Sequence, residues 1–308
     1  MTQLQRLVIV PNQFEHQLIT LTTSQQHYLR RVLRLQEGDR FIAVDGSGHW
    51  FLSELSSSSE QATVIEELDG CTELPVTVTL IIAMPKQGMD DIVRHCTELG
   101  VTTIQPVMSD RTVLKPSAQK VERWQRIAEE SAEQSERRFV PQVLSPCPFH
   151  HCLSQLAIAS SLQDRVVADV NNKQDVEQDV EQEQSGYLRA GYLRAGYMQA
   201  GYICVARHDA PHLLHILSQQ SKTRFITTLS THVQTPDAQT EGQLVTLNSP
   251  AEWVVAVGPE GGWTPEEIDR AIAHGYQPVS LGQRILRAVT APTVALSLIS
   301  SILEQDIK

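Results

Sequence analysis

From residue 74 to the end of the chain, short apolar runs alternate with longer segments of helical periodicity. Short β-branched runs bounded by glycine or proline predict buried strands, and the longer segments predict helices. The predicted strands cover 76–85, 102–109, 253–258 and 277–282, and the predicted helices cover 90–100, 117–138, 265 to about 274, and a final segment after residue 292. Because strands that alternate with helices build a parallel sheet with helices on its faces, an α/β domain is predicted.

Residues 1–73 have a different pattern, which is rich in predicted strands. The segment 40–55 alternates apolar and polar residues around a DGSG turn, a strong signal for a β-hairpin. A short predicted helix just before it carries Arg30, Arg31 and Arg34. These arginines form either a solvated basic face or the phosphate contacts of a small β-barrel module.

The composition is that of a soluble globular protein. The 308 residues are 41% hydrophobic and 20% charged, and no segment approaches the roughly 18 apolar residues that suggest a membrane span. The first residues lack the basic start and the cleavage site of a secretory signal, so a cytoplasmic protein is expected. The five cysteines are odd in number and scattered, which favours reduced thiols over a disulfide framework.

The net charge of −11 argues against a nucleic-acid partner when the whole chain is counted. Its distribution changes that conclusion, because 169–185 alone holds six acidic residues and a single lysine. That segment accounts for −5 of the −11, so about half of the imbalance is local. Basic residues elsewhere can still form a stripe.

Two groups of histidine and cysteine residues have side chains of the kind that bind metals. The sequence CPFHHC at 147–152 has suitable ligand types but no second ligand pair at the spacing of a zinc finger. His208, His212 and His215 lie near helical spacing. Such residues are more often simply solvated, so no metal is expected.

Residues 171–201 do not follow the strand–helix alternation. A DVEQ unit and a GYLRA unit recur there in tandem, and a repeat period of five residues matches no solenoid. We predict an exposed insertion without chemistry, inside a second domain that covers 74–308. A polar stretch at 230–243 is predicted to be a loop.

The segment VGPEGGWTPEEID at 257–269 connects a predicted strand to a predicted helix. Gly261 and Gly262 permit positive φ and leave backbone N–H groups open to a ligand. Thr264 is a good N-cap, and Glu267 three residues later completes a capping box. This arrangement is the usual ligand edge of an open α/β sheet, unless the glycines serve only the geometry of a tight turn. The segment lacks the fingerprints of a dinucleotide site and of a phosphate loop.

A second turn, LGQRILRAVTA at 281–291, also follows a predicted strand, so both turns are expected at one carboxyl edge. Together with GPEGG at 258–262, it resembles the 16S ribosomal RNA (uracil-N3) methyltransferases of the SPOUT superfamily. Supporting matches run along most of the chain: HYLRRVLR at 27–34, the strand end that contains Lys86, TELGV at 97–101, Asp110-Arg111, and AEQSERRFVP at 132–141.

This resemblance implies an N-terminal PUA-like β-barrel that helps to hold RNA, followed by a SPOUT α/β domain with a C-terminal trefoil knot. It also implies S-adenosylmethionine as cofactor, N3 of a uridine in 16S (small-subunit) ribosomal RNA as target, and a homodimer. Two other functions stay open. One is a SPOUT methyltransferase that acts on transfer RNA or on a ribose 2′-hydroxyl, and the other is a non-catalytic RNA-binding or ribosome-assembly protein.

The final helix supports the expectation of a homodimer. Its apolar stripe is expected to need a partner, and it runs through Val294, Leu296, Leu298, Ile299 and Ile302.

The resemblance also implies roles for individual residues. The residues expected to bind the cofactor are Gly258, Glu260, Gly261, Gly262, Leu281, Gly282, Ile285 and Leu286. The residues expected to contact RNA are Arg30, Arg31, Arg34, Lys86, Arg111 and Arg137. Because N3 of uracil is a poor nucleophile while protonated, Arg284 and Arg287 are candidates to stabilise the uracil anion. The alternative for each is a structural tie to loop carbonyls.

The chain departs from the family pattern at two positions. Val289 stands where the pattern LRxET has glutamate, and His95 stands where a lysine is expected before TELGV. A valine can neither accept a proton nor orient an N–H group, so any carboxylate role at this position is absent or relocated. Glu260 is the only acid within either cofactor motif, and its side chain is expected to point toward the cofactor or to cap its own turn.

Overall fold

The computed structural model describes residues 4–58, 60–70, 72–112, 116–156, 199–206, 209–219 and 252–305. These residues fall into two compact units. The first unit comprises Met1–Leu74, Met89–Ile104 and Ser117–Val143, and the second comprises Pro75–Gly88, Gln105–Pro116 and Leu144–Lys308. The predicted domain boundary after residue 73 stays a prediction.

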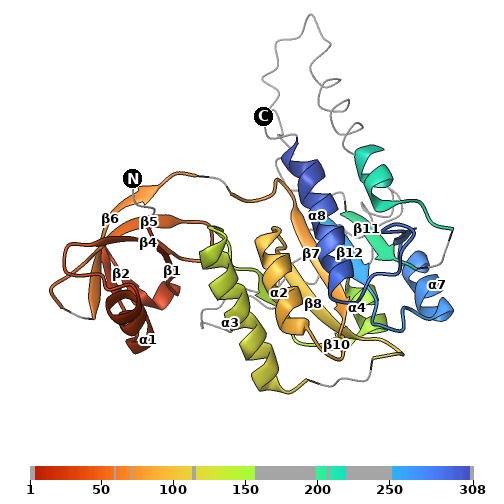
Figure 1. Cartoon of the computed structure of the whole chain (residues 1–308), viewed down its shortest axis with the longest axis horizontal. Helices are drawn as coiled ribbons and strands as arrows, with labels where there is room; N and C mark the ends of the chain where they lie inside the picture. The colour runs from red at the N-terminus through yellow and green to blue at the C-terminus, as the bar shows by residue number, and fades with distance from the viewer. Residues whose placement is uncertain are drawn as a thin grey trace, which may run out of the picture. The chain divides into compact units, whose positions relative to one another are not determined.

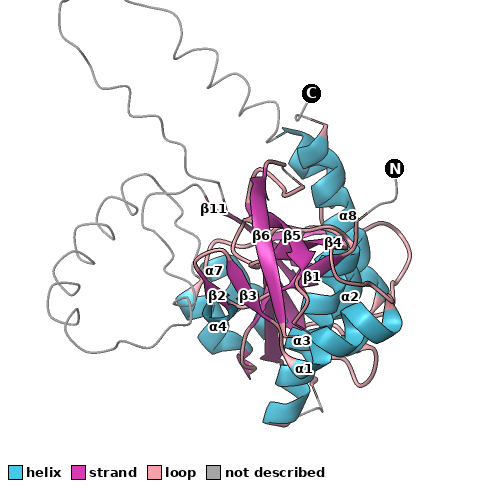
Figure 2. Ribbon diagram, turned by 90° about the vertical axis from the view of Figure 1, so that its left-hand side faces the viewer, coloured by secondary structure: helices cyan, strands magenta, loops and turns pink. Residues whose placement is uncertain are grey.

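The first unit contains a six-stranded sheet in the order β1-β4-β5-β6-β3-β2. Its strands are β1 (Arg6–Val8), β2 (Phe14–Glu15), β3 (Leu18–Thr20), β4 (Arg40–Val44), β5 (Trp50–Leu55) and β6 (Gln61–Leu68). β1 pairs with β4 in parallel and the other pairs are antiparallel. Figure 2 shows β4, β5 and β6 side by side. Among the described residues β1 and β2 are the two edges, so the sheet forms a half-barrel, in agreement with the predicted PUA-like β-barrel.

The β4–β5 hairpin confirms the predicted turn at 45–48. The Asp45 carboxylate accepts hydrogen bonds from the backbone N–H groups of Ser47 and His49, and Gly46 and Gly48 take positive φ angles of 71° and 119°. The first unit also contains three short helical segments. The 3-10 turn η1 (Pro11–Gln13) comes first, and the short helix α1 (Thr23–His27) continues directly into the π-helical turn η2 (Tyr28–Val32). Apolar side chains of these strands and of η2 pack into one core.

Two long helices complete the first unit, α2 (Met89–Glu98) and α3 (Ala118–Gln134). They are joined through Asp90 of α2, whose carboxylate accepts from Arg123 at 2.6 Å and from the buried Trp124 indole at 3.2 Å. α3 also reaches β1, because Glu133 accepts a hydrogen bond from the backbone N–H of Val8 at 2.5 Å. After α3, β9 (Gln142–Val143) pairs with the first residues of β8, Thr103 and Ile104.

The second unit contains a parallel sheet in the order β10-β8-β7-β12-β11-β13. Its strands are β7 (Thr77–Ala83), β8 (Thr103–Met108), β10 (Cys147–Pro148), β11 (Gln199–Cys204), β12 (Glu252–Val257) and β13 (Gln277–Val279). β7 and β12 are almost entirely buried, as expected for strands covered on both faces. The helices of this unit are α4 (Phe149–Gln155), α7 (Pro265–Ala273) and α8 (Thr290–Glu304), and residues 213–219 are also helical. The predicted α/β alternation is therefore confirmed.

Strand β11 corrects the predicted insertion at 171–201. Its residues 199–201 pair with Glu252, Trp253 and Val254 of β12, and Tyr202 behind them is almost fully buried. The last three residues of the predicted insertion are therefore part of an interior strand. The rest of that insertion, and the predicted loop at 230–243, lie outside the described residues.

Helix α8 packs against β12 (Figure 1). Leu296, Ile299 and Ile302 of its apolar stripe are already buried within the chain, so the stripe does not by itself require a second copy. The homodimer and the trefoil knot stay predictions. Within the described ranges no helix is long and apolar enough to cross a membrane.

Candidate functional site

Three parallel strands of the second unit end at the same level. Cys204 of β11 pairs with Val257 of β12 and with Val279 of β13. The segments that follow these strands therefore leave the sheet together at its carboxyl edge, as predicted for the two turns. In open α/β sheets this edge is where ligands bind.

A cavity of about 410 Å³ lies where these segments converge. The eight residues that the sequence assigns to the cofactor all line it: Gly258, Glu260, Gly261, Gly262, Leu281, Gly282, Ile285 and Leu286. Arg284 and Arg111 also line it, and Arg287 does not. The wall contains further residues that the sequence did not single out, among them Cys204, Trp263 and Gln283. Burial raises the pKa of Cys204 to about 12, so this wall residue is an uncharged thiol.

The glycines of the first turn have separate structural reasons. Gly262 takes the positive φ, 69°, whereas Gly261 does not, so the sequence argument for positive φ holds at one of the two. A Cβ on Gly258 would lie 3.2 Å from Nε1 of Trp263, which leaves no slack for a side chain. A Cβ on Gly261 would meet the flexible side chain of Arg111 at 3.1 Å. Gly258 and Gly261 are therefore packed closely on one side, whereas Gly262 has open space around it and is glycine for its φ angle.

Helix α7 starts with the predicted capping box. Thr264 Oγ1 accepts from the backbone N–H of Glu267, and Glu267 Oε2 accepts from the backbone N–H of Thr264 at 2.8 Å. Glu267 has a further role that the local pattern does not indicate. Its Oε1 accepts from the backbone N–H of Asp110 at 2.9 Å, and the side chain is 2% exposed. One buried carboxylate thus ties the start of α7, directly after the first turn (258–262), to the segment after β8.

Two other contacts hold the first turn. Glu260 Oε1 accepts from the backbone N–H of Lys86 at 3.0 Å, so its side chain caps the end of β7 while lining the cavity. Arg111 donates from Nη1 to the carbonyl of Gly261. The Lys86 side chain itself is exposed. The Arg111 guanidinium thus holds the first turn through the carbonyl of Gly261, and the Lys86 main chain holds it through the Glu260 side chain.

The second turn is irregular and partly exposed. Ser280 Oγ accepts from the N–H of Gly282 at 3.1 Å, and Gly282 has a φ of 117°. Ile285, at 58% exposure, offers an apolar side chain to the cavity. Arg284 and Arg287 are exposed, and neither side chain makes a hydrogen bond or ion pair with the described part of the chain. The carbonyl of Arg287 accepts from the first N–H groups of α8.

The two departures from the family pattern have different surroundings. Val289 packs on Gly88, because a Cβ on Gly88 would lie 2.5 Å from Cγ2 of Val289. Gly88 also has a positive φ of 88°, so this position is glycine for two reasons. The site that the family pattern gives to a carboxylate is here an apolar contact. His95 lies in the last turn of α2 and is partly buried.

The three arginines near the N-terminus that are predicted to contact RNA differ in their contacts within the chain. Arg30 donates from Nη2 to the carbonyls of Ser56 and Ser58 at 2.9 and 3.0 Å, so its guanidinium holds the connection between β5 and β6. Arg31 and Arg34 are exposed. Neither side chain makes a hydrogen bond or ion pair with the residues that the structure describes.

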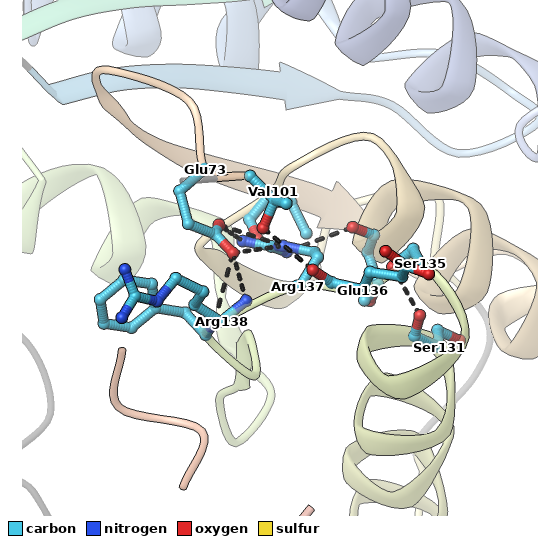
Figure 3. A network of polar contacts seen from close by, with 10 residues as sticks. Glu73, Val101, Ser131, Ser135, Glu136, Arg137 and Arg138 are labelled. Carbon is cyan, nitrogen blue, oxygen red and sulfur yellow. Dashed lines mark hydrogen bonds and ion pairs between the residues drawn. The ribbon is translucent and has the colours of Figure 1, made fainter. Parts of the chain in front are cut away.

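Arg137 is placed in the interior of the first unit, at 4% exposure (Figure 3). It forms an ion pair with Glu73 at 2.6 Å and donates to the carbonyls of Thr97 and Val101 at 3.2 and 2.6 Å. Glu73 also accepts from the backbone N–H of Arg138. With its donors directed to protein acceptors, Arg137 is a structural tie, and this placement does not support the predicted RNA contact.

The histidine and cysteine groups show no metal geometry in the described ranges, where no three such ligand residues or carboxylates gather. His150 and His151 are exposed in α4, and His212 uses Nδ1 to accept from the backbone N–H of Leu214. His208 lies outside the described residues.

Comparisons with known proteins agree with this geometry. The family model of an RNA methyltransferase domain matches residues 72–191 and 189–300, and that of an RNA methyltransferase PUA domain matches 21–67. A ribosomal RNA small subunit methyltransferase E from Synechocystis sp. is 40% identical over 97% of this chain and 78% of its own length. The protein of the same description from Bacillus subtilis is 28% identical over 91% of this chain and 89% of its own.

Solved structures show the same fold. A ribosomal RNA small subunit methyltransferase E from Neisseria gonorrhoeae, bound to S-adenosyl methionine, matches with a TM-score of 0.67 and 24% identity over 97% of this chain and 98% of that one. A Legionella pneumophila methyltransferase with bound SAM matches with a TM-score of 0.65 and 19% identity over 97% and 98%. With two RNA methyltransferase models covering most of its length and a 40% identical relative, the chain belongs to the ribosomal RNA small subunit methyltransferase E family.

Proposed function

We propose that this chain methylates N3 of a uridine in small-subunit ribosomal RNA, with S-adenosylmethionine as methyl donor. The observation that carries the proposal is the cavity at the carboxyl edge, where two loops of the family motifs converge. A methyl transfer from a sulfonium needs alignment of donor and nucleophile rather than a metal.

The residues present fit such a donor. A volume of about 410 Å³ lies within the range of roughly 300–1,000 Å³ that small-molecule sites span. Main-chain groups of Gly258, Gly262 and Gly282 can read the polar parts of the ligand, and Ile285 and Leu286 can pack on its apolar parts. A side chain at Gly258 would have to displace the Trp263 indole, because its Cβ would lie 3.2 Å from Nε1.

When bound, S-adenosylmethionine supplies a methyl group whose bond to sulfur breaks as a bond to uracil N3 forms. The chain must stabilise the uracil as the N3 proton leaves. Arg284 lines the cavity with its donors unused by the described residues, so its guanidinium can stabilise negative charge on the uracil oxygens. Glu260 has one oxygen on the Lys86 N–H, and we assign its other oxygen, Oε2, as the acceptor of the N3 proton.

Substitutions at Glu260 and Val289 separate this mechanism from a non-catalytic role. Glu260→Gln keeps an oxygen for the Lys86 N–H but cannot take a proton, so kcat should fall by about 10²–10⁴-fold with little change in donor affinity. Glu266→Gln, in the exposed first turn of α7, is the control. Val289→Glu should bring no gain, because that side chain packs on Gly88. An inactive wild type that Val289→Glu activates would make the chain a lapsed enzyme that binds RNA.

Two finer points belong to the same proposal. Arg31 and Arg34 of the first unit are the residues we assign to RNA phosphates, because both are exposed and basic. We also propose a homodimer, as the family resemblance implies. Light scattering at micromolar concentration should give about twice the chain mass of 34.3 kDa, and a mass near 34.3 kDa alone would contradict it.

The function itself is tested in cells. Nucleosides from small-subunit ribosomal RNA of a strain lacking the gene should have lost 3-methyluridine, and the wild-type chain should restore it. The Arg284→Ala chain should restore it poorly. Unchanged 3-methyluridine in the deletion strain, with loss of a transfer RNA or ribose methylation instead, would assign the chain to another RNA.

A further inference from the structure

Two cysteines of the second unit lie together at the start of α4. Pro148 is the N-cap of this helix, so Cys147 precedes the cap and Cys152 is the fourth helical residue. Side chains at these two positions commonly contact each other at helix starts. Here Cys147 packs against the core cluster to which Cys152 belongs, and each thiol shifts the pKa of the other.

The two thiols differ in access and in acidity. Cys152 is 1% exposed and belongs to the core, whereas Cys147 is only partly buried. The neighbouring Cys152 thiol lowers the pKa of Cys147, against the effect of its burial, and the Cys147 thiol together with burial raises the pKa of Cys152. A reagent in solution can thus reach Cys147, which has the greater thiolate fraction, and Cys152 is placed to react with Cys147 alone.

This cysteine pair is connected to the cofactor cavity by close packing. Phe149, the first residue of α4, stacks on Trp263 with ring centroids 4.2 Å apart and an interplanar angle of 21°. Cys152, Phe149 and Trp263 belong to one core cluster. Trp263 lines the cavity and its indole contacts the bare face of Gly258. A movement of the first turn of α4 would therefore displace the cavity wall through the stacked pair of Phe149 and Trp263.

We propose that Cys147 and Cys152 form a redox-active dithiol, which a small disulfide such as oxidised glutathione converts into an intramolecular disulfide that weakens cofactor binding. The effect on the cofactor rests on the proposed function. The disulfide itself does not.

The exchange is balanced in two steps. The Cys147 thiolate attacks one sulfur of oxidised glutathione, which forms a mixed disulfide and releases one glutathione thiolate. Cys152 then loses its proton and attacks the Cys147 sulfur, which releases the second glutathione. The two protein thiols lose two electrons and two protons, and one glutathione disulfide is reduced to two thiols.

A disulfide would change the geometry at the start of α4. It holds two sulfurs about 2.05 Å apart, closer than two sulfur atoms without a covalent bond can pack, so the first turn of α4 must move. Phe149 moves with that turn and takes its stacking partner Trp263 with it. Because packed side chains have little slack, we expect affinity for the donor to fall about tenfold.

The test uses the full chain at a series of ratios of reduced to oxidised glutathione. Free thiols are then alkylated and the peptide that contains 147–152 is examined by mass spectrometry, while calorimetry measures S-adenosylmethionine affinity. We expect this peptide to lose both labels, affinity to fall about tenfold, and dithiothreitol to reverse both changes. Cys147→Ser should keep its affinity at every ratio, because Cys152 is then left without a partner thiol and is shielded from solvent.

Each other outcome overturns part of the proposal. Full labelling of both cysteines at every ratio, or glutathione that stays attached to Cys147, would show that the pair does not close. A disulfide that forms without a change in affinity would overturn the connection through Phe149 and Trp263. Cys152→Ala provides a second variant if Cys147→Ser folds poorly. A reduced chain that binds no S-adenosylmethionine would count against the proposed function, while the labelling would still decide the disulfide.

Discussion

Among the side chains near the cavity, Glu267 is the one whose removal should lower the stability of the second unit most. Its carboxylate accepts two backbone hydrogen bonds, from Thr264 at 2.8 Å and from Asp110 at 2.9 Å, while the side chain is 2% exposed. The first bond caps α7 and the second joins that helix to the segment after β8. Glu267→Ala removes both acceptors and leaves two N–H groups without their partners.

The size of the effect follows from these contacts. An N–H group that loses a buried partner costs about 1–3 kcal/mol, and both groups are only partly buried, so water offsets some of the loss. Glu267→Ala should therefore lower the free energy of unfolding by about 2–4 kcal/mol. Glu267→Gln keeps one carbonyl oxygen and should lose about half as much. Glu266→Ala, its exposed neighbour, should stay within about 0.5 kcal/mol of the wild type.

Urea unfolding followed by circular dichroism gives the three free energies, and calorimetry with S-adenosylmethionine shows whether the cofactor turn is displaced. Donor affinity should fall for Glu267→Ala and not for Glu266→Ala, because Asp110 is followed by Arg111, which holds the carbonyl of Gly261. If the two alanine variants are equally stable, the buried carboxylate is not a tie between the two segments, and the reasoning fails.

Three further predictions concern other parts of the chain. Burial, together with the neighbouring Glu129 and Glu130, raises the pKa of Glu133 from 4.5 to about 7. The folded state therefore holds this proton more tightly than the unfolded state does. The resulting stabilisation is present below pH 4.5 and falls by about 3 kcal/mol as the pH rises to 7. Glu133→Gln should remove that part of the pH dependence in urea titrations, and equal pH profiles would refute it. Gly88→Ala should lower the free energy of unfolding by about 1–3 kcal/mol, because Gly88 has a φ of 88° and a Cβ there would contact Val289. Adding Val289→Ala to the same chain should recover only the part of the loss that comes from this contact. Full recovery of stability would exclude backbone strain at Gly88. Arg31→Ala and Arg34→Ala should weaken RNA binding and reduce its salt slope by about 0.7–0.9 each, and an unchanged slope would exclude phosphate contact.

The parts of the fold that could be predicted are those encoded over short stretches of sequence. The capping box at Thr264 and Glu267, and the turn between β4 and β5, were predicted from a few adjacent residues because their hydrogen bonds are local. The convergence of the two cofactor turns was predicted as well, since parallel strands place their carboxyl ends on one edge. Local patterns of sequence therefore predict the edge of the sheet at which the cavity lies.

β11 was missed for a specific physical reason. Its first residues continue the GYLRA-type units, so the tandem pattern concealed the start of the apolar run that follows. What makes 199–204 a strand is pairing with β12 on one side and β13 on the other. Those partners come about fifty residues or more later in the chain, and hydrophobic periodicity within the segment carries no information about them.

The arginines also depend on partners that are distant in sequence, which local patterns do not reveal. A guanidinium carries five donors, and main-chain carbonyls satisfy them as well as phosphates do. Arg30, Arg111 and Arg137 find acceptors that lie 26, 150 and 64 residues away in sequence. A matching motif therefore cannot distinguish an arginine that binds RNA from one that holds the fold. That distinction depends on whether tertiary structure brings a carbonyl or a carboxylate within reach, and this is why Arg31 and Arg34, exposed to solvent, carry the RNA proposal for the first unit.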